Sequence, residues 1–232
     1  MKLTPVGIVH SPFREKFGIP RQPGLIAEVA ATIELLPPFN REEAVRGLEG
    51  FSHLWLIFGF HAIPPHTGSL TVRPPRLGGN QRVGVFASRS THRPNPLGLS
   101  AVVFVGFEQA AGKVLLKIQG ADLLDGTPVY DIKPYLPYAD AIPAALGGFA
   151  DRAPEPQLSV VFSAAADRRC TELETERPQL RALIIAVLAL DPRPAFKGEE
   201  HERVYGVRLF DLDVRWQVHE RCAQVVTIKI FT

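Results

Sequence analysis

Apolar and polar residues alternate along much of the first half of the chain. In residues 28–35 every second position is apolar, which is the period of a strand with one buried face. Residues 51–60 are nearly all apolar or aromatic, which predicts a strand buried on both faces. The pattern predicts five further strands, over residues 6–10, 82–87, 99–107, 113–119 and 129–135.

One segment of this half, residues 41–48, predicts a helix. Asn40 can cap its first amides, and Glu43 follows three residues later, in the spacing of a capping box. Seven strands and one short helix predict a mainly β domain, and closure into a barrel removes exposed strand edges. A Rossmann sheet is excluded, because it requires a helix between successive strands.

The pattern changes after residue 137. Residues 139–156 are rich in Ala, Gly and Pro, which indicates a linker. Beyond the linker we predict two helices, over residues 164–177 and 178–190, and Pro178 opens the second. We also predict three strands there, over residues 158–162, 209–218 and 225–231. We therefore predict two domains, an N-terminal closed β-barrel (residues 1–145) and a small C-terminal α+β domain (residues 155–232).

Composition narrows the class of protein. Of the 232 residues, 46% are hydrophobic and 22% are charged, as in ordinary globular proteins. The longest apolar stretches, residues 54–60 and 183–190, are too short to cross a bilayer, and the start of the chain has no apolar signal core. Cys170 and Cys222 have no spacing typical of a disulfide framework. We expect a cytoplasmic protein with no membrane partner.

Charge is unevenly distributed, although the formal net charge is only +2. No Asp or Glu lies between Glu49 and Glu108, whereas five arginines do: Arg73, Arg76, Arg82, Arg89 and Arg93. This tract predicts a positive surface that suits a polyanion such as a nucleic acid. Arginines that only solvate loop ends would explain the pattern equally well.

Three polar segments are candidates for binding chemistry. Residues 20–25 form a loop that presents Arg21 and Gln22 between two prolines, although a surface turn explains it equally well. Residues 83–98 place Arg89 and Arg93 four positions apart, a pair that can grip a phosphate or a carboxylate. Residues 121–128 contain an Asp-Gly turn whose amides can cradle a small cofactor, although a plain hairpin turn also explains the pair.

A metal site is not expected. His53, His61 and His66 are near one another in sequence, but no carboxylate lies among them and both cysteines are distant. The acidic residues of the third segment do not have the spacing of a calcium loop. The chain also has no nucleophile elbow, phosphate loop or HExxH motif.

These segments resemble the YaeB/TsaA-like family, whose characterised members are the TrmO tRNA methyltransferases. The resemblance rests on RQPGL, EGFSHLWLIFGFH, TVRPPRLGGN, GVFASRSTHRPNPLGLS and DLLDGTPVYDIKPYLPYAD, and on DPRPAF and LFDLDVRWQV nearer the end. It implies a homodimeric β-barrel enzyme that uses S-adenosylmethionine to methylate tRNA. The implied target is N6 of N6-threonylcarbamoyladenosine at tRNA position 37, immediately 3′ of the anticodon.

The resemblance also implies site residues. The cofactor pocket of the family corresponds to Arg21, Gln22, Pro23, Gly24, Leu25, His61, Ala62, Arg89, Asp122, Leu123, Leu124, Asp125 and Gly126. We expect Arg76, Arg93 and Asn95 to contact the substrate tRNA. The segment 63–68 is specific to this chain, so His66 receives no role.

His61 is our candidate general base, because an imidazole titrates near neutral pH. A structural histidine in an aromatic strand is an equally good interpretation. Arg89 is a second candidate catalytic residue, since Arg89 or Arg93 can pair with the threonyl carboxylate or with a phosphate. Two other functions remain open: a noncatalytic RNA-binding barrel and a methyltransferase that acts on a small molecule.

Overall fold

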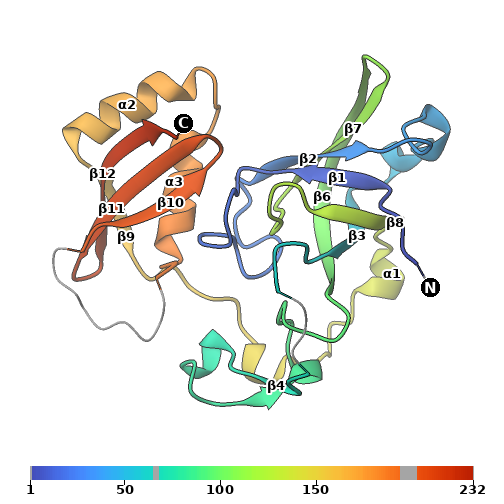
Figure 1. Cartoon of the computed structure of the whole chain (residues 1–232), viewed down its shortest axis with the longest axis horizontal. Coiled ribbons are helices and arrows are strands. Elements are labelled where there is room, and N and C mark those ends of the chain that lie inside the picture. The colour runs from blue at the N-terminus through green and yellow to red at the C-terminus, as the bar shows by residue number, and fades with distance from the viewer. Residues whose placement is uncertain (1, 65–67, 194–202, 232) are drawn as a thin grey trace. The chain divides into compact units, whose positions relative to one another are not determined.

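The computed structural model describes residues 2–64, 68–193 and 203–231 (Figure 1). These residues form two compact units. The described residues of 2–10, 31–119 and 126–153 form the first unit, and those of 11–30, 120–125 and 154–231 form the second. Two segments distant in sequence, residues 11–30 and 120–125, therefore fold together with the C-terminal part of the chain.

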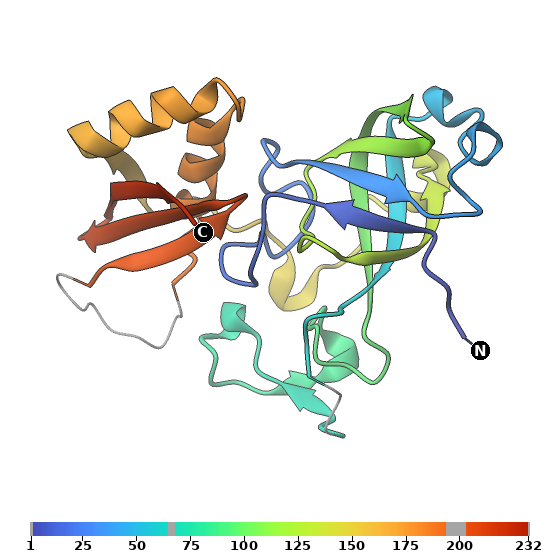
Figure 2. The ribbon, with the colours of Figure 1, turned by 45° about the horizontal axis from the view of Figure 1, so that its top comes forward.

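The first unit is built on a closed six-stranded barrel, which confirms the predicted fold class. Its strands follow the order β1-β2-β7-β6-β3-β8, so every strand has a hydrogen-bonded neighbour on both sides (Figure 2). The strands are β1 (Gly7–His10), β2 (Ala30–Leu35), β3 (His53–Gly59), β6 (Leu97–Ala110), β7 (Lys113–Gln119) and β8 (Pro128–Pro134). Closure leaves this sheet without a free edge.

Apolar side chains from all six strands fill the barrel. Val9, Ile33, Leu56, Leu116 and Val129 are fully buried. The prediction that the strand within residues 51–60 is buried on both faces is wrong, because buried positions of β3 alternate with half-exposed ones. A barrel has a single interior, so each of its strands buries one face only.

The predicted helix over residues 41–48 is also wrong. The chain forms two short 3-10 turns there, η1 (Glu42–Ala44) and η2 (Leu48–Gly50), and Gly47 between them has φ of 89°. Asn40 does not cap a helix; its Nδ2 donates a hydrogen bond to the Gly112 carbonyl at 3.0 Å. Val45 is buried but its neighbours are exposed, so no apolar face supports a longer helix.

The strand predicted over residues 82–87 is shorter than expected. Only β5 (Val83–Gly84) is extended, and it pairs with β4 (Thr71–Val72) in a small hairpin that the pattern did not predict. The 3-10 turns η3 (Pro75–Leu77) and η4 (Val85–Ala87) complete this excursion between β3 and β6. The short helix α1 (Pro137–Asp140) and the 3-10 turn η5 (Gly148–Ala150) follow the barrel.

The C-terminal part of the second unit is a sheet with the two predicted helices. The sheet has four strands rather than the three predicted, because residues 205–209 form a strand of their own before the turn at Phe210 and Asp211. Strand order is β10-β11-β12-β9, and β9 lies parallel to β12. The elements are β9 (Ser159–Phe162), α2 (Ala164–Glu174), α3 (Leu180–Ala189), β10 (Tyr205–Leu209), β11 (Leu212–His219) and β12 (Cys222–Ile230). Pro178 does not open the second helix, because Gln179 adopts a left-handed φ of 65° and α3 begins after it.

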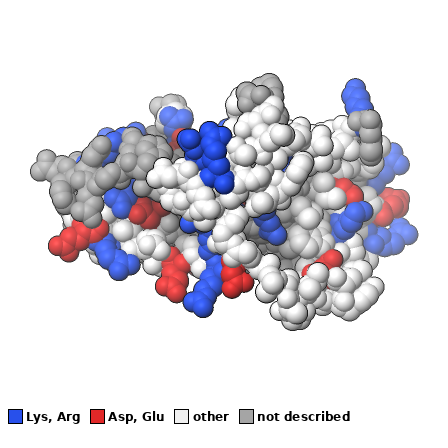
Figure 3. Space-filling view, turned by 90° about the horizontal axis from the view of Figure 1, so that it is seen from below, with Lys and Arg blue, Asp and Glu red and all other residues white. Residues whose placement is uncertain are grey.

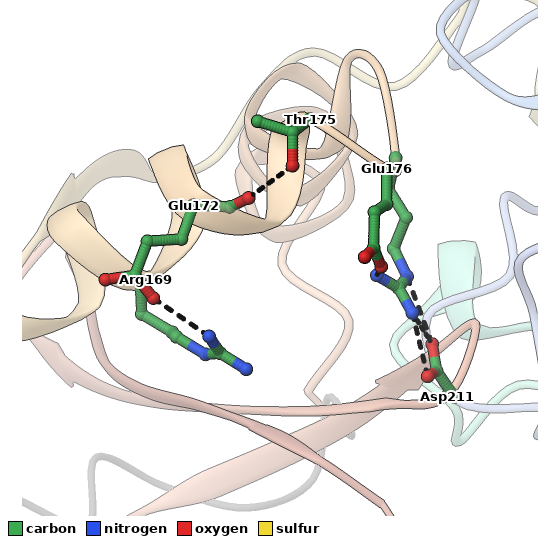
Figure 4. Close-up of polar contacts among 6 residues, drawn as sticks. Arg169, Glu172, Thr175, Glu176 and Asp211 are labelled. Carbon is green, nitrogen blue, oxygen red and sulfur yellow. Dashed lines mark hydrogen bonds and ion pairs between the residues drawn. The ribbon is translucent and has the colours of Figure 1, made fainter.

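An ion pair joins two connections in this part of the fold. Arg177, which follows α2, donates hydrogen bonds to both carboxylate oxygens of Asp211 at 2.8 Å, and so joins the α2–α3 connection to the β10–β11 turn (Figure 4).

Cys170 and Cys222 are both free. Burial raises the pKa of the Cys170 thiol, which keeps it protonated and unreactive at neutral pH.

Gly98 in β6 tests how tightly the barrel is packed. A Cβ atom at this position would lie 2.3 Å from the ring of Phe58, which is 3% exposed and packs edge-on against Phe60. We expect Gly98→Ala to lower the free energy of unfolding by about 1–3 kcal/mol in chemical denaturation. Gly84→Ala is the matched control, because nothing lies within 4 Å of a Cβ there. Equal stability of the two variants would contradict this account.

Candidate functional site

Two of the predicted cofactor segments meet in the second unit. The amide of Gly24 donates a hydrogen bond to the carbonyl of Gly120 at 2.8 Å. A Cβ on Gly120 would lie 3.3 Å from the Gly24 Cα. Both residues have positive φ, 75° at Gly24 and 71° at Gly120. The positive φ therefore favours glycine at both positions, and the 3.3 Å contact is a second reason for glycine at position 120. It brings the loop of residues 21–25 beside the start of the segment 120–125.

Residues that sequence reasoning missed hold this second segment in place. The Ser11 hydroxyl donates to the Leu123 carbonyl at 2.7 Å, and the Ser11 amide donates to Asp125 Oδ1 at 3.1 Å. Arg14 forms an ion pair with the other carboxylate oxygen of Asp125. Leu123 is buried, whereas Asp122, Leu124 and Asp125 are half-buried. Asp125 thus positions the segment. The polar residues of the run Ser-Pro-Phe-Arg, directly after β1, were the sequence feature that could have indicated these contacts.

The loop that carries Arg21 is anchored on the C-terminal sheet. Phe13 forms a β-bridge with Leu209. The ring of Phe17 stacks on Trp216, with centroids 6.0 Å apart. A Cβ on Gly18, whose φ is 88°, would lie 2.7 Å from a methyl group of Val207. These contacts hold the stretch that precedes the loop, in which Arg21 and Gly24 are exposed.

His61 and Ala62 lie on an exposed turn directly after β3, in the first unit. Because His61 is exposed and outside the strand, its interpretation as a histidine of an aromatic strand is wrong. The amide of Phe60 donates to the Pro96 carbonyl at 2.8 Å, which ties this turn to the arginine-bearing loop. A Cβ on Gly126 would lie 3.8 Å from His61 Nε2, so a larger residue there would cover the imidazole.

The loop between η4 and β6 is shaped by its own side chains. Nη1 of Arg93 donates to the carbonyls of Ser88 and Ser90, at 3.2 and 3.3 Å. Arg93 is half-buried, whereas Arg89 and Asn95 are exposed. Arg76, on η3, donates to the carbonyl of Arg152, in the segment after the barrel. Arg76 and Arg93, both expected to bind tRNA, therefore also donate hydrogen bonds to backbone carbonyls.

Basic side chains are placed differently in the two units. In the second unit acids neutralise many of them, as in the pairs Arg169–Glu172, Arg181–Asp167 and Arg215–Asp213. Figure 3 shows acidic groups close to basic ones on the face that it draws. In the excursion between β3 and β6, by contrast, Arg73, Arg76 and Arg82 form no ion pair with any described residue. That excursion is the part of the first unit best suited to an anionic partner.

Among residues 2–64, 68–193 and 203–231, no three His, Cys, Asp or Glu side chains gather as metal ligands would. The same residues include no helix that is both long and apolar enough to span a bilayer. His66 and the last three residues of the DPRPAF motif lie outside the described residues.

A closed antiparallel barrel with polar connectors, followed by an α+β unit, defines a class of protein distinct from the Rossmann-like enzymes. It is the architecture of the crystal structure of TrmO from Pseudomonas aeruginosa, which superposes with a TM-score of 0.83 at 44% identity and covers 99% of this chain and 98% of that one. The profile of the tRNA-methyltransferase O N-terminal domain matches residues 8–141, and the profile of the TrmO C-terminal domain matches residues 155–230. The chain belongs to the TrmO family.

Relatives are similar over nearly the whole chain or over part of it. The tRNA (adenine(37)-N6)-methyltransferase of Escherichia coli strain K12 is 48% identical over 225 residues, which are 97% of this chain and 96% of the relative. A Pyrococcus abyssi protein, named a probable S-adenosyl-L-methionine-binding protein, is 40% identical over 136 residues, 59% of this chain and 68% of that protein.

Asp125 provides a test of the positioning contacts. We expect Asp125→Ala to lower the free energy of unfolding by about 1–3 kcal/mol, because it leaves the buried Ser11 amide without its acceptor. Asp125→Asn keeps an oxygen for that amide and should cost less. Glu108→Ala, which removes the exposed ion pair with Lys117, is the control and should cost at most about 1 kcal/mol. Equal losses for Asp125→Ala and Glu108→Ala in urea unfolding would refute the assigned role.

Proposed function

We propose that this chain is an S-adenosylmethionine-dependent methyltransferase that methylates N6 of N6-threonylcarbamoyladenosine at position 37 of tRNA. The observation that carries the proposal is its 48% identity, over 97% of its length, to a relative named for methylation of adenine 37 at N6. The acid-free, arginine-bearing excursion of the barrel supports a tRNA substrate. We place this activity in the cytoplasm.

The residues of the second unit suit the methyl donor chemically. S-adenosylmethionine combines an adenine ring, ribose hydroxyls, a charged amino-acid end and a sulfonium whose methyl carbon is electrophilic. Half-buried Leu25 and Leu124 offer apolar contact to a ring, and Arg21 and Asp122 offer charges for a carboxylate and for hydroxyl or ammonium groups. The bare backbone at Gly24 and Gly120 leaves room for close approach. Gln22, Pro23, Ala62 and Arg89 remain proposed contacts on the family resemblance.

His61 is the proposed general base. The N6 atom of an acylated adenosine is a weak nucleophile, because its lone pair is delocalised, and it must lose its proton as the N–CH₃ bond forms and the S–CH₃ bond breaks. The imidazole accepts that proton, and the sulfur keeps the electron pair of the broken bond. Exposure of His61 and the absence of a side chain at Gly126 leave the imidazole accessible to a substrate.

Arg89 is the proposed partner of the threonyl carboxylate. Arg93 is half-buried and donates to two carbonyls of its own loop, so we assign it to loop shape and to a secondary contact with tRNA. Arg89 is exposed on the same loop, and its guanidinium can pair with a carboxylate through two parallel hydrogen bonds. Such a pair would favour the threonylcarbamoylated base over plain adenosine.

The test is methyl transfer to two tRNAs, one with N6-threonylcarbamoyladenosine and one with adenosine at position 37, followed by mass spectrometry of nucleosides. We expect the wild type to methylate the first tRNA only. Arg89→Ala should lose about ten-fold or more of kcat/KM on the modified tRNA, as befits one charged hydrogen-bonded pair. Arg215→Ala, which removes a paired arginine of the second unit, should match the wild type.

The alternatives give different results. A noncatalytic RNA-binding barrel would bind tRNA but not S-adenosylmethionine in calorimetry. A small-molecule methyltransferase would bind the donor but show no salt-dependent affinity for tRNA. Failure of the wild type to methylate either tRNA would overturn the proposed function. Unchanged selectivity of Arg89→Ala would overturn only the role of Arg89.

We further infer a homodimer, formed through the outer face of β6. Outward-facing positions of this strand are apolar and exposed, with Leu99 54% and Val105 56% exposed. Leu97 and Val103 continue the row, and Ile57 of β3 lies opposite Leu99 in register. A row of this kind costs solvation free energy in a monomer and suits an apolar contact between two copies.

Light scattering after size-exclusion chromatography tests the homodimer. We expect the wild type at twice the chain mass of 25.5 kDa. Val105→Lys should shift it toward the monomer, because the contact would desolvate the charge of the lysine. Ile142→Lys, at a position 67% exposed beyond the barrel, is the control and should leave the mass unchanged. A monomeric wild type, or a Val105→Lys variant that stays dimeric, would contradict this assignment.

A further inference from the structure

The excursion between β3 and β6 exposes two large apolar side chains. Leu70 is 72% exposed and Phe86 is 81% exposed. Both belong to the hairpin region of β4 and β5, which Figures 1 and 2 show standing off the barrel. An exposed leucine alone is ordinary, but a phenylalanine this open to water usually has a partner in the functional state.

Local structure dictates the exposure of Phe86. Its neighbour Val85 is buried, 2% exposed, and the Val85 amide donates to the Leu70 carbonyl at 2.9 Å. The hydroxyl of Ser88 donates to the Val85 carbonyl, also at 2.9 Å. In a 3-10 turn successive side chains are about 120° apart, so a turn anchored through Val85 holds Phe86 outward. The ring is therefore presented in a fixed place rather than on a loose tip.

The segment that carries Phe86 contains arginines and no acidic residue. The hairpin carries Arg82, whose Nη1 donates to the Thr71 hydroxyl at 2.9 Å, and Arg73 lies next to β4. The chain has no acidic residue between Glu49 and Glu108. An aromatic ring among cations is typical of surfaces that bind single-stranded nucleic acid, where bases stack on rings and phosphates meet arginines. An apolar protein partner would not require the cations.

We propose that Phe86 stacks on an unpaired base of the tRNA anticodon loop, and that Arg82 contacts a phosphate beside that base. The inference rests on the proposed function and adds to it a residue that binds substrate without taking part in the chemistry. Stacking is tolerant of sequence, because every base has a π face. Phe86 would thus hold the loop open beside the modified adenosine in tRNAs of different sequence.

Affinity for an anticodon stem-loop RNA, measured by fluorescence anisotropy with the full chain at fixed salt, tests the proposal. We expect Phe86→Ala to weaken binding about 5- to 150-fold, the range for loss of one stacked base. Phe86→Trp should stay within a few-fold of the wild type. Affinity for S-adenosylmethionine should not change in any variant. Tyr138→Ala is the matched control, because Tyr138 is an aromatic residue 87% exposed in the same unit, near Asp140, and it should bind like the wild type.

Two further measurements separate stacking from charge. Removal of the stacked base, by an abasic nucleotide at each loop position in turn, should weaken wild-type binding at one position and leave Phe86→Ala unaffected there. Arg82→Ala should reduce the slope of log affinity against log salt by about 1, whereas Phe86→Ala should leave the slope unchanged.

Each contrary outcome is distinct. If the wild type methylates tRNA and Phe86→Ala binds RNA equally well, the stacking role is wrong and the proposed function stands. If Phe86→Ala converts a dimer into a monomer, the ring belongs to an interface between copies, and the stacking role is again overturned. If the wild type neither binds nor methylates tRNA, the proposed function fails, and this inference fails with it.

Discussion

Closure of the six-stranded sheet is the constraint on which the rest of the structure depends. Each barrel strand uses its backbone donors and acceptors on two neighbours, and its buried side chains are apolar apart from Ser100 of β6. Neither the edges nor the interior of the barrel can therefore bind a polar ligand. Polar chemistry is confined to the connectors, residues 11–29, 60–96 and 120–127, and every residue assigned to cofactor or tRNA lies in one of them.

Much of the fold could be predicted from local patterns. The apolar alternation placed β7 at its observed bounds, and the strand count predicted a barrel. The failures have a common cause, because local signals do not report the tertiary surroundings. A capping box formed by Asn40 and Glu43 predicts a helix, but Gly47 adopts a left-handed conformation that interrupts one. The segment also has no buried apolar face that would stabilise a helix. Likewise, apolar residues on the outer face of β3 look the same in sequence as a second buried face.

The candidate site was predictable as segments and not as contacts. Contiguous motifs identified the loops that carry Arg21, Arg89 and Asp122. They could not reveal that Asp125 binds Ser11, because the two residues are 114 positions apart. Nor does periodicity say whether an aromatic residue in a polar loop faces in or out, and the exposure of Phe86 follows only from the anchoring of its neighbour Val85.

The composition of the second unit limits how the chain can be divided. Residues 11–30 and 120–125 complete its packing, through the bridge from Phe13 to Leu209 and the stacking of Phe17 on Trp216. Truncation after residue 153 would remove Leu209 and Trp216, against which Phe13 and Phe17 pack. In a chimera that takes only the last 80 or so residues from a relative, residues 11–30 of this chain would pack against a sheet of different sequence. A recombinant that keeps the cofactor loops intact must therefore take residues 11–30, 120–125 and the C-terminal part from the same parent. The unit that exchanges as a whole is set by packing and is discontinuous in sequence.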